Sequence, residues 1–115
     1  MKILIADDDP VSLRLLEAVL TKWGHETVLA RDGEEAWTAL QNEGLRMAII
    51  DWMMPRLDGV GLCKRIREAD LAGYRYVVLL TSKQEKQDLL EGLNAGADDY
   101  VLKPFDPREL EVRLN

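Results

Sequence analysis

A short apolar run that ends in a carboxylate constrains this chain more than any other stretch. Residues 47–50, MAII, lead without a break into Asp51, and Pro55 follows soon after. A continuous apolar run of this length, bounded by charge and proline, is typical of a strand buried on both faces. Asp51 then lies at the carboxyl end of that strand. In open α/β sheets this is the edge where ligands bind and chemistry takes place.

Apolar runs of this kind alternate with segments of helical periodicity. The predicted strands are Ile3 to Ala6, His25 to Ala30, Met47 to Asp51, Tyr76 to Leu80 and Tyr100 to Leu102. Helix-start signals lie at Asp9 with Pro10, Asp32 with Glu35, Asp58, Ser82 with Glu85, and Asp106 with Pro107. The fourth helix carries an apolar stripe of Leu89, Leu90 and Leu93 and closes near Gly96.

The β-α pattern repeats five times, and crossovers this short require parallel strands with right-handed connections. Helices then cover both faces of the sheet. The sequence therefore predicts an α/β fold: a flavodoxin-like, three-layer αβα sandwich around a five-stranded parallel sheet. The order 2-1-3-4-5 is one of the two common strand orders for such a chain, and it is the one that we expect. With 115 residues the chain forms one domain, residues 1–115. The fifth helix, which ends at Asn115, is too short to be stable by itself, so we expect it to be truncated and the domain to be part of a longer multidomain protein.

The net charge and the composition exclude several classes of function. The net charge of −6 argues against direct nucleic-acid binding by this domain, because binding to phosphates requires a basic surface. Cys63 is the single cysteine, which excludes a disulfide framework and favours the cytoplasm. We expect Cys63 to be a small buried hydrophobe. The apolar run after Lys2 is too short for a membrane span, so no membrane association is expected.

Reactive side chains converge on one edge of the predicted sheet. The order 2-1-3-4-5 makes the first and third strands neighbours, so Asp7 and Asp8 lie beside Asp51, while Thr81 and Lys103 follow the fourth and fifth strands. Three adjacent carboxylates need a counter-charge, and Mg²⁺ is held by such a set. The lysine and the hydroxyl can bind phosphoryl oxygens, and a carboxylate can act as the nucleophile. The predicted reaction is phosphoryl transfer onto Asp51.

The acid pair after ILIA, the DWMMP segment, LLTS and YVLKPF closely resemble the receiver domain of response regulators in bacterial two-component (phosphorelay) signalling. The resemblance covers essentially the whole chain in order and spacing. It implies that Asp51 accepts a phosphoryl group from the phosphohistidine of a sensor histidine kinase or phosphotransfer protein. It further implies a signalling phosphoacceptor rather than an enzyme.

The resemblance also assigns ligands. It implies that Asp8, Asp51 and the Met53 backbone carbonyl bind Mg²⁺ directly, with Mn²⁺ as an alternative ion, and that Asp7 assists through water. Thr81 would bind one phosphoryl oxygen, and Lys103 would pair with another.

A conformational switch is implied as well. On phosphorylation Thr81 would move toward the phosphoryl group and Tyr100 would turn inward, although by residue type alone Tyr100 is equally a half-buried strand aromatic. The face formed by the fourth helix, fifth strand and fifth helix would then change for an output module or a second copy of the chain, giving a phosphorylation-dependent homodimer. The Lys103–Pro104 bond is expected to be cis.

Three other functions compete with that of a phosphoacceptor. Asp7, Asp9 and Val11 fit the first motif of haloacid-dehalogenase-type phosphatases, but Asp98 and Asp99 precede Lys103 instead of following it. Helix capping also explains Asp9 fully. A nucleotide-binding flavodoxin-like domain would need a Gly/Ser/Thr-rich loop where this chain has three acids. A degenerate receiver that acts only as a docking module is the remaining alternative.

Overall fold

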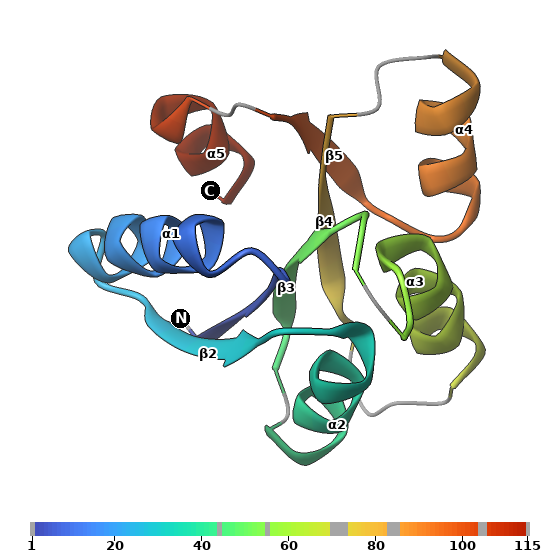
Figure 1. Ribbon diagram of the computed structural model, residues 1–115, viewed down its shortest axis with the longest axis horizontal. Helices are drawn as coiled ribbons and strands as arrows, with labels where there is room; N and C mark the ends of the chain where they lie inside the picture. Colours follow the sequence, from blue (N-terminus) through green and yellow to red (C-terminus); the bar gives the residue numbers. More distant parts are fainter. Residues whose placement is uncertain are drawn as a thin grey trace.

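The computed structural model describes residues 2–43, 45–54, 56–69, 74–82, 86–103 and 106–114. The strands are β1 (Lys2–Ala6), β2 (Glu26–Ala30), β3 (Met47–Asp51), β4 (Tyr76–Thr81) and β5 (Asp99–Leu102). The helices are α1 (Pro10–Lys22), α2 (Gly33–Glu43), α3 (Gly59–Glu68), α4 (Lys86–Asn94) and α5 (Pro107–Leu114). All strand pairs are parallel and the order is β2-β1-β3-β4-β5, which confirms the predicted topology (Figure 1).

Side chains of the inner strands alternate between two apolar layers. Ile3 and Ile5 of β1 pack with α1 and α5, whereas Leu4 and Ala6 pack with the layer that contains α2 and α3. Figure 1 shows α1 and α5 on one side of the sheet and α2, α3 and α4 on the other. Every residue of β3 is buried, as expected for a central parallel strand. The core therefore fixes the direction in which β3 delivers Asp51.

The predicted caps hold α1, α2 and α3 at the edge where the strands end. Asp9 caps α1 and accepts a hydrogen bond from the Val11 amide (3.1 Å). Asp32 accepts from the Glu35 amide (2.8 Å), and Asp58 accepts from the Gly61 amide (2.8 Å). Each cap satisfies an amide that the helix itself leaves without a partner. The capping role predicted for Asp9 is confirmed.

The buried face of α4 differs from the one that its leucines suggest. Leu90 and Leu93 are 48% and 42% exposed, whereas Gly92 and Ala95 are buried. A Cβ atom on Gly92 would lie 3.0 Å from Leu79 and 3.2 Å from the indole of Trp52. Helix α4 thus turns its small residues toward the sheet, because Trp52 already fills the space beside it.

Several sequence expectations fall outside the described residues. The positions concerned are Gly44, Pro55, Lys83, Glu85, Pro104, Phe105 and Asn115, and with them the expected cis bond and the Ser82–Glu85 capping box. Among the described residues, no helix is both long and apolar enough to cross a membrane. Cys63 is buried on α3, as predicted.

Candidate metal centre

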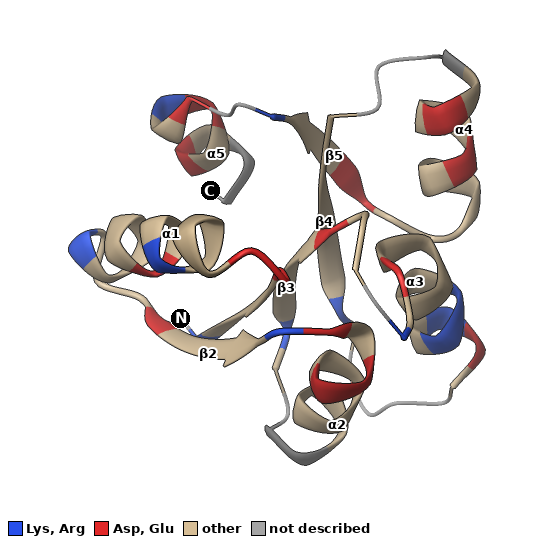
Figure 2. Cartoon of the chain, viewed as in Figure 1, with Lys and Arg blue, Asp and Glu red and all other residues tan. Residues whose placement is uncertain are grey.

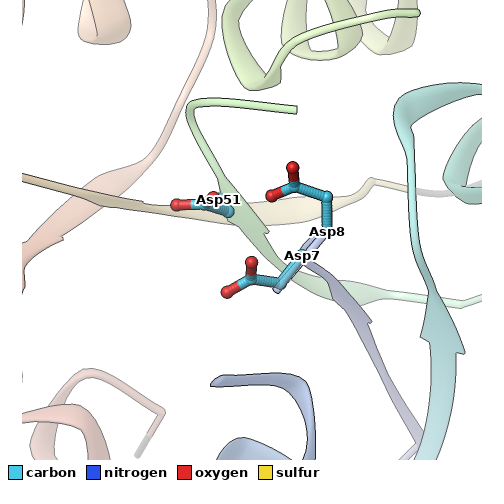
Figure 3. Close-up of side chains that lie close together, drawn as sticks. All are labelled: Asp7, Asp8 and Asp51. Atoms are coloured by element: carbon cyan, nitrogen blue, oxygen red, sulfur yellow. The ribbon is translucent and has the colours of Figure 1, made fainter. Parts of the chain in front are cut away.

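Three aspartates meet where β1 and β3 end. Ala6 pairs with Ile50 across these strands, so the residues that follow, Asp7 and Asp51, reach the same edge of the sheet. One carboxylate oxygen from each of Asp7, Asp8 and Asp51 lies within 4.8 Å of the others (Figure 3). Asp7 is fully buried and Asp51 is 6% exposed, while Asp8 is exposed. Figure 2 shows the acidic β1–α1 connection at this edge.

Lys103 brings a positive charge to the same cluster. Its backbone amide donates to the Thr81 carbonyl (2.8 Å), which extends the pairing of β4 and β5 by one residue. Its ammonium Nζ lies 2.8 Å from Asp51 Oδ1 and 3.4 Å from Asp7 Oδ2. The lysine, which follows β5, therefore bridges the two buried carboxylates.

Burial and the neighbouring opposite charge shift the pKa values of Asp51 and Lys103 in opposite directions. Burial raises the pKa of Asp51 above its usual value; the hydrogen bond from Lys103 works against this shift, and the neighbouring charges of Asp7 and Asp8 add to it. Burial also lowers the pKa of Lys103, but the carboxylates of Asp51 and Asp7 outweigh it, so the net pKa of the ammonium is raised. The lysine stays charged, and ionisation of Asp51 carries an electrostatic cost that a bound cation would remove.

The orientation of Asp7 depends on a contact that the sequence reasoning missed. The Asp9 amide donates to Asp7 Oδ1 (3.0 Å), and the Asp7 amide donates to the Ala30 carbonyl (3.0 Å). The first contact is an Asx-type turn, in which an aspartate side chain accepts from the amide two residues on. The run of three acids before a helix was the signal that could have revealed it.

The aspartate cluster fits a hard divalent cation. Octahedral Mg²⁺ holds oxygens at about 2.1 Å, so its ligands lie about 3 to 4 Å from one another. Carboxylate oxygens within 4.8 Å of one another approach that spacing and supply the ligand type that Mg²⁺ prefers. The set contains neither nitrogen nor sulfur, the ligands that zinc favours.

The other predicted residues lie on neighbouring elements. Thr81 is buried at the end of β4, one residue beyond Leu80, which pairs with Asp51. Tyr100 is half-buried on β5 and packs against the apolar layer that includes Trp52. The side chain of Met53 is 62% exposed, on the connection that follows Asp51.

Comparisons with known proteins agree with this arrangement. The family model described as the response regulator receiver domain matches residues 3–115. The chain is 46% identical over 114 residues to the probable transcriptional regulator ycf27 of Cyanophora paradoxa, covering 98% of the chain and 46% of that protein. It is 40% identical over 113 residues to the alkaline phosphatase synthesis transcriptional regulatory protein PhoP of Bacillus subtilis, again covering 98% and 46%. The chain thus spans about half the length of these relatives.

Solved structures give the same result. The receiver domain of the Francisella response regulator 1452 superimposes with a TM-score of 0.92 at 36% identity, covering 99% of this chain and 93% of that one. The chemotaxis protein CheY4 of Vibrio cholerae superimposes with a TM-score of 0.91 at 28% identity, covering 98% and 94%. With the topology, the aspartate cluster and the family match in agreement, this chain belongs to the response-regulator receiver domains of two-component signalling.

Proposed function

We propose that Asp51 is the phosphoacceptor of this domain and that the reaction requires Mg²⁺. The observation that carries the proposal is the position of Asp51, which is buried, lies within the aspartate cluster and contacts Lys103 at 2.8 Å. An Asp51 oxygen forms a bond to phosphorus while the bond from phosphorus to the donor breaks. The leaving group departs with the electron pair and takes a proton from water.

The surrounding residues have separate roles in this proposal. Asp8 and Asp51, with the Met53 backbone carbonyl, would hold the ion, and Asp7 would assist through water. When bound, Mg²⁺ neutralises charge on the phosphoryl oxygens and aligns them. Lys103 is already within reach of Asp51 and would pair with one of those oxygens, because its three N–H donors are free to rotate toward the product.

Thr81 and Tyr100 would carry the signal away from the site. Thr81 would donate its hydroxyl to a phosphoryl oxygen, and Tyr100 would turn inward in response. The structure supports the proximity that this requires, since Leu79 pairs with Tyr100 and Thr81 pairs with Leu102 on adjacent strands. The two-state element would be the face of α4, β5 and α5, through which the domain would also form a phosphorylation-dependent homodimer.

The partners follow from the family. The donor is the phosphohistidine of a sensor kinase or phosphotransfer protein, acting in the cytoplasm. The output is a further module of a longer regulator, with this chain as its receiver. The printed names of the relatives describe transcriptional regulators, so we propose that transcription is the output.

Intact mass spectrometry tests the phosphoacceptor directly. The protein is incubated with acetyl phosphate, with MgCl₂ or with EDTA, beside an Asp51→Asn variant. We expect one added phosphoryl group in the parent with Mg²⁺, and none in the variant or with EDTA. No addition to the parent under any condition would favour the docking-module alternative, and equal addition to the variant would move the acceptor elsewhere.

A further inference from the structure

The first residue of α2 touches the backbone of the connection between β3 and α3. A Cβ atom on Gly33 would overlap with the Leu57 carbonyl oxygen, and it would lie 2.5 Å from Leu57 Cβ and 2.8 Å from the Leu57 carbonyl carbon. Cβ atoms essentially never approach other heavy atoms within 3.0 Å. Two of these three atoms are backbone atoms, and the third, Leu57 Cβ, is bonded directly to the backbone, so none of them is the end of a flexible side chain. Any larger residue at position 33 therefore has to displace the backbone at Leu57.

The same connection is also closely packed at Gly59, where it meets the backbone of Asp51 and Trp52. A Cβ atom on Gly59 would lie 2.8 Å from the Asp51 carbonyl oxygen and 2.9 Å from Trp52 Cα. The Gly59 amide donates to the Trp52 carbonyl (2.9 Å), and the Trp52 amide donates to the carbonyl of Leu80 on β4 (2.9 Å). Because Gly59 follows Leu57 by only two residues, a shift at Leu57 reaches the backbone of Asp51.

Contacts on both sides of Arg56 maintain a strained backbone conformation in this connection. Arg56 adopts a φ of 71°, a left-handed conformation that a residue with a Cβ atom adopts at an energetic cost. Such a conformation persists where the flanking contacts determine it. On one flank the Arg56 guanidinium lies 3.6 Å from Asp32, the residue before Gly33, and on the other Asp58 caps α3.

Resting on the proposed function, we propose that Gly33 is a positioning residue for phosphoryl transfer. Because Gly33 has no side chain, the Leu57 backbone can pack against the start of α2. This packing contact fixes the position of the β3–α3 connection. Through Gly59, the connection then orients Asp51 and the residues after it for Mg²⁺. Gly33 contacts neither the ion nor the phosphoryl group, and acts through Leu57 and Gly59.

The test compares two glycine-to-alanine variants. Gly33→Ala forces the close contact described above. Gly24→Ala is the matched control, because Gly24 has a φ of 89° but no atom within 4 Å of the added Cβ. This control strains the backbone at the end of α1, beside the start of β2 and away from the edge where Asp51 lies. Both variants are expected to lose stability, which urea unfolding measures.

Mg²⁺ affinity separates positioning from stability. It is measured by titrating each folded protein with MgCl₂ and following backbone amide chemical shifts, and phosphorylation by acetyl phosphate is followed in parallel. We expect Gly33→Ala to weaken Mg²⁺ binding by about tenfold or more and to slow phosphorylation comparably. Gly24→Ala should keep the parent values of both. Parent-like Mg²⁺ affinity in Gly33→Ala, or an equal loss in Gly24→Ala, would overturn the proposal.

A second variant covers the case in which Gly33→Ala does not fold. Leu57→Ala removes a side chain that packs on the core and whose Cδ1 lies 2.8 Å from the Cβ position of Gly61. This substitution weakens the packing of Leu57 against the start of α2 without introducing a steric clash. We therefore expect Mg²⁺ binding to weaken several-fold. Unchanged affinity in a folded Leu57→Ala protein would count against the proposal. Failure of the parent to accept a phosphoryl group would instead count against the proposed function, because the Mg²⁺ titration is independent of that reaction.

Discussion

Replacement of Lys103 by methionine measures how strongly the metal centre depends on a positive charge. The ammonium lies 2.8 Å from Asp51 and 3.4 Å from Asp7. At an effective dielectric constant of about 20, these distances correspond to gross attractions of about 6 and about 5 kcal/mol. The cost of desolvating the charges cancels most of this, and the lysine side chain is 27% exposed. We expect Lys103→Met to lower the free energy of unfolding by about 1–3 kcal/mol without metal, between the usual values for exposed and buried pairs.

Mg²⁺ should offset part of that loss. Without the ammonium, Asp51 and Asp7 are free to bind a cation, so the variant should bind Mg²⁺ more tightly than the parent does. A tenfold gain in affinity corresponds to about 1.4 kcal/mol of extra stabilisation at saturating Mg²⁺. The variant should therefore gain more stability from Mg²⁺ than the parent gains, even though it lacks a donor for the phosphoryl group.

Urea unfolding followed by circular dichroism, with EDTA or with saturating MgCl₂, provides the assay. Lys64→Met is the control, because Lys64 is an exposed lysine on α3. The control should match the parent in both conditions. A Lys103→Met protein as stable as the parent in EDTA, or one that gains no more from Mg²⁺ than the parent does, would refute the electrostatic account of this pair.

Three further predictions concern other described residues. Burial raises the pKa of the Cys63 thiol to about 12. The thiol should therefore react with a disulfide reagent at neutral pH at least about 100-fold more slowly in the native protein than in the protein unfolded in urea. Equal rates would contradict the burial of Cys63. Arg67 donates to the carbonyls of Gly96 (2.8 Å) and Arg75 (2.7 Å) and pairs with Asp98 (2.9 Å). Arg67→Ala should therefore lower the free energy of unfolding, measured in urea, by about 2–4 kcal/mol. A loss below about 1 kcal/mol would show that these contacts contribute little. Burial raises the pKa of Asp51 in the native state above the ordinary value of 3.8, so between that value and the raised pKa the native state binds more protons than the unfolded state. Stability is therefore lost as the pH rises through that interval. In EDTA the stability of Asp51→Asn relative to the parent should be greater at about pH 7 than at about pH 4, and an unchanged difference would contradict the direction of the shift.

The sequence was sufficient for the fold because its signals are local. Apolar runs mark the inner strands, and capping aspartates such as Asp9 and Asp58 mark where helices begin. The repeated β-α pattern and the handedness of its connections predicted parallel strands, and the strand order was one of the two common solutions for such a chain. The convergence of Asp7, Asp8 and Asp51 was also predictable, since parallel strands bring their carboxyl ends to one edge of the sheet.

Sequence patterns could not predict contacts between backbone segments that are far apart in the sequence. Nothing in the periodicity of α2 indicates that Gly33 faces Leu57, because that contact depends on the path of a connection whose Leu57 lies 24 residues later in the sequence. The hydrophobicity of Leu90 and Leu93 likewise favoured a buried stripe on α4. Packing reversed this preference, because the Trp52 indole occupies the position that a leucine would need and Gly92 fits beside it.

Charge balance at the metal centre explains why a signal generated there would be transmitted through β4 and β5. Three ionised aspartates and one lysine leave a net charge of −2, which a divalent cation cancels. Under the proposed function, conversion of Asp51 to an acyl phosphate adds negative charge at a buried position, 2.8 Å from the ammonium of Lys103. The Lys103 amide is bonded to the Thr81 carbonyl at 2.8 Å, so any movement of the lysine acts directly on the end of β4. Since α4 follows β4 and α5 follows β5, the response to the new charge would reach the α4–β5–α5 face before the rest of the domain.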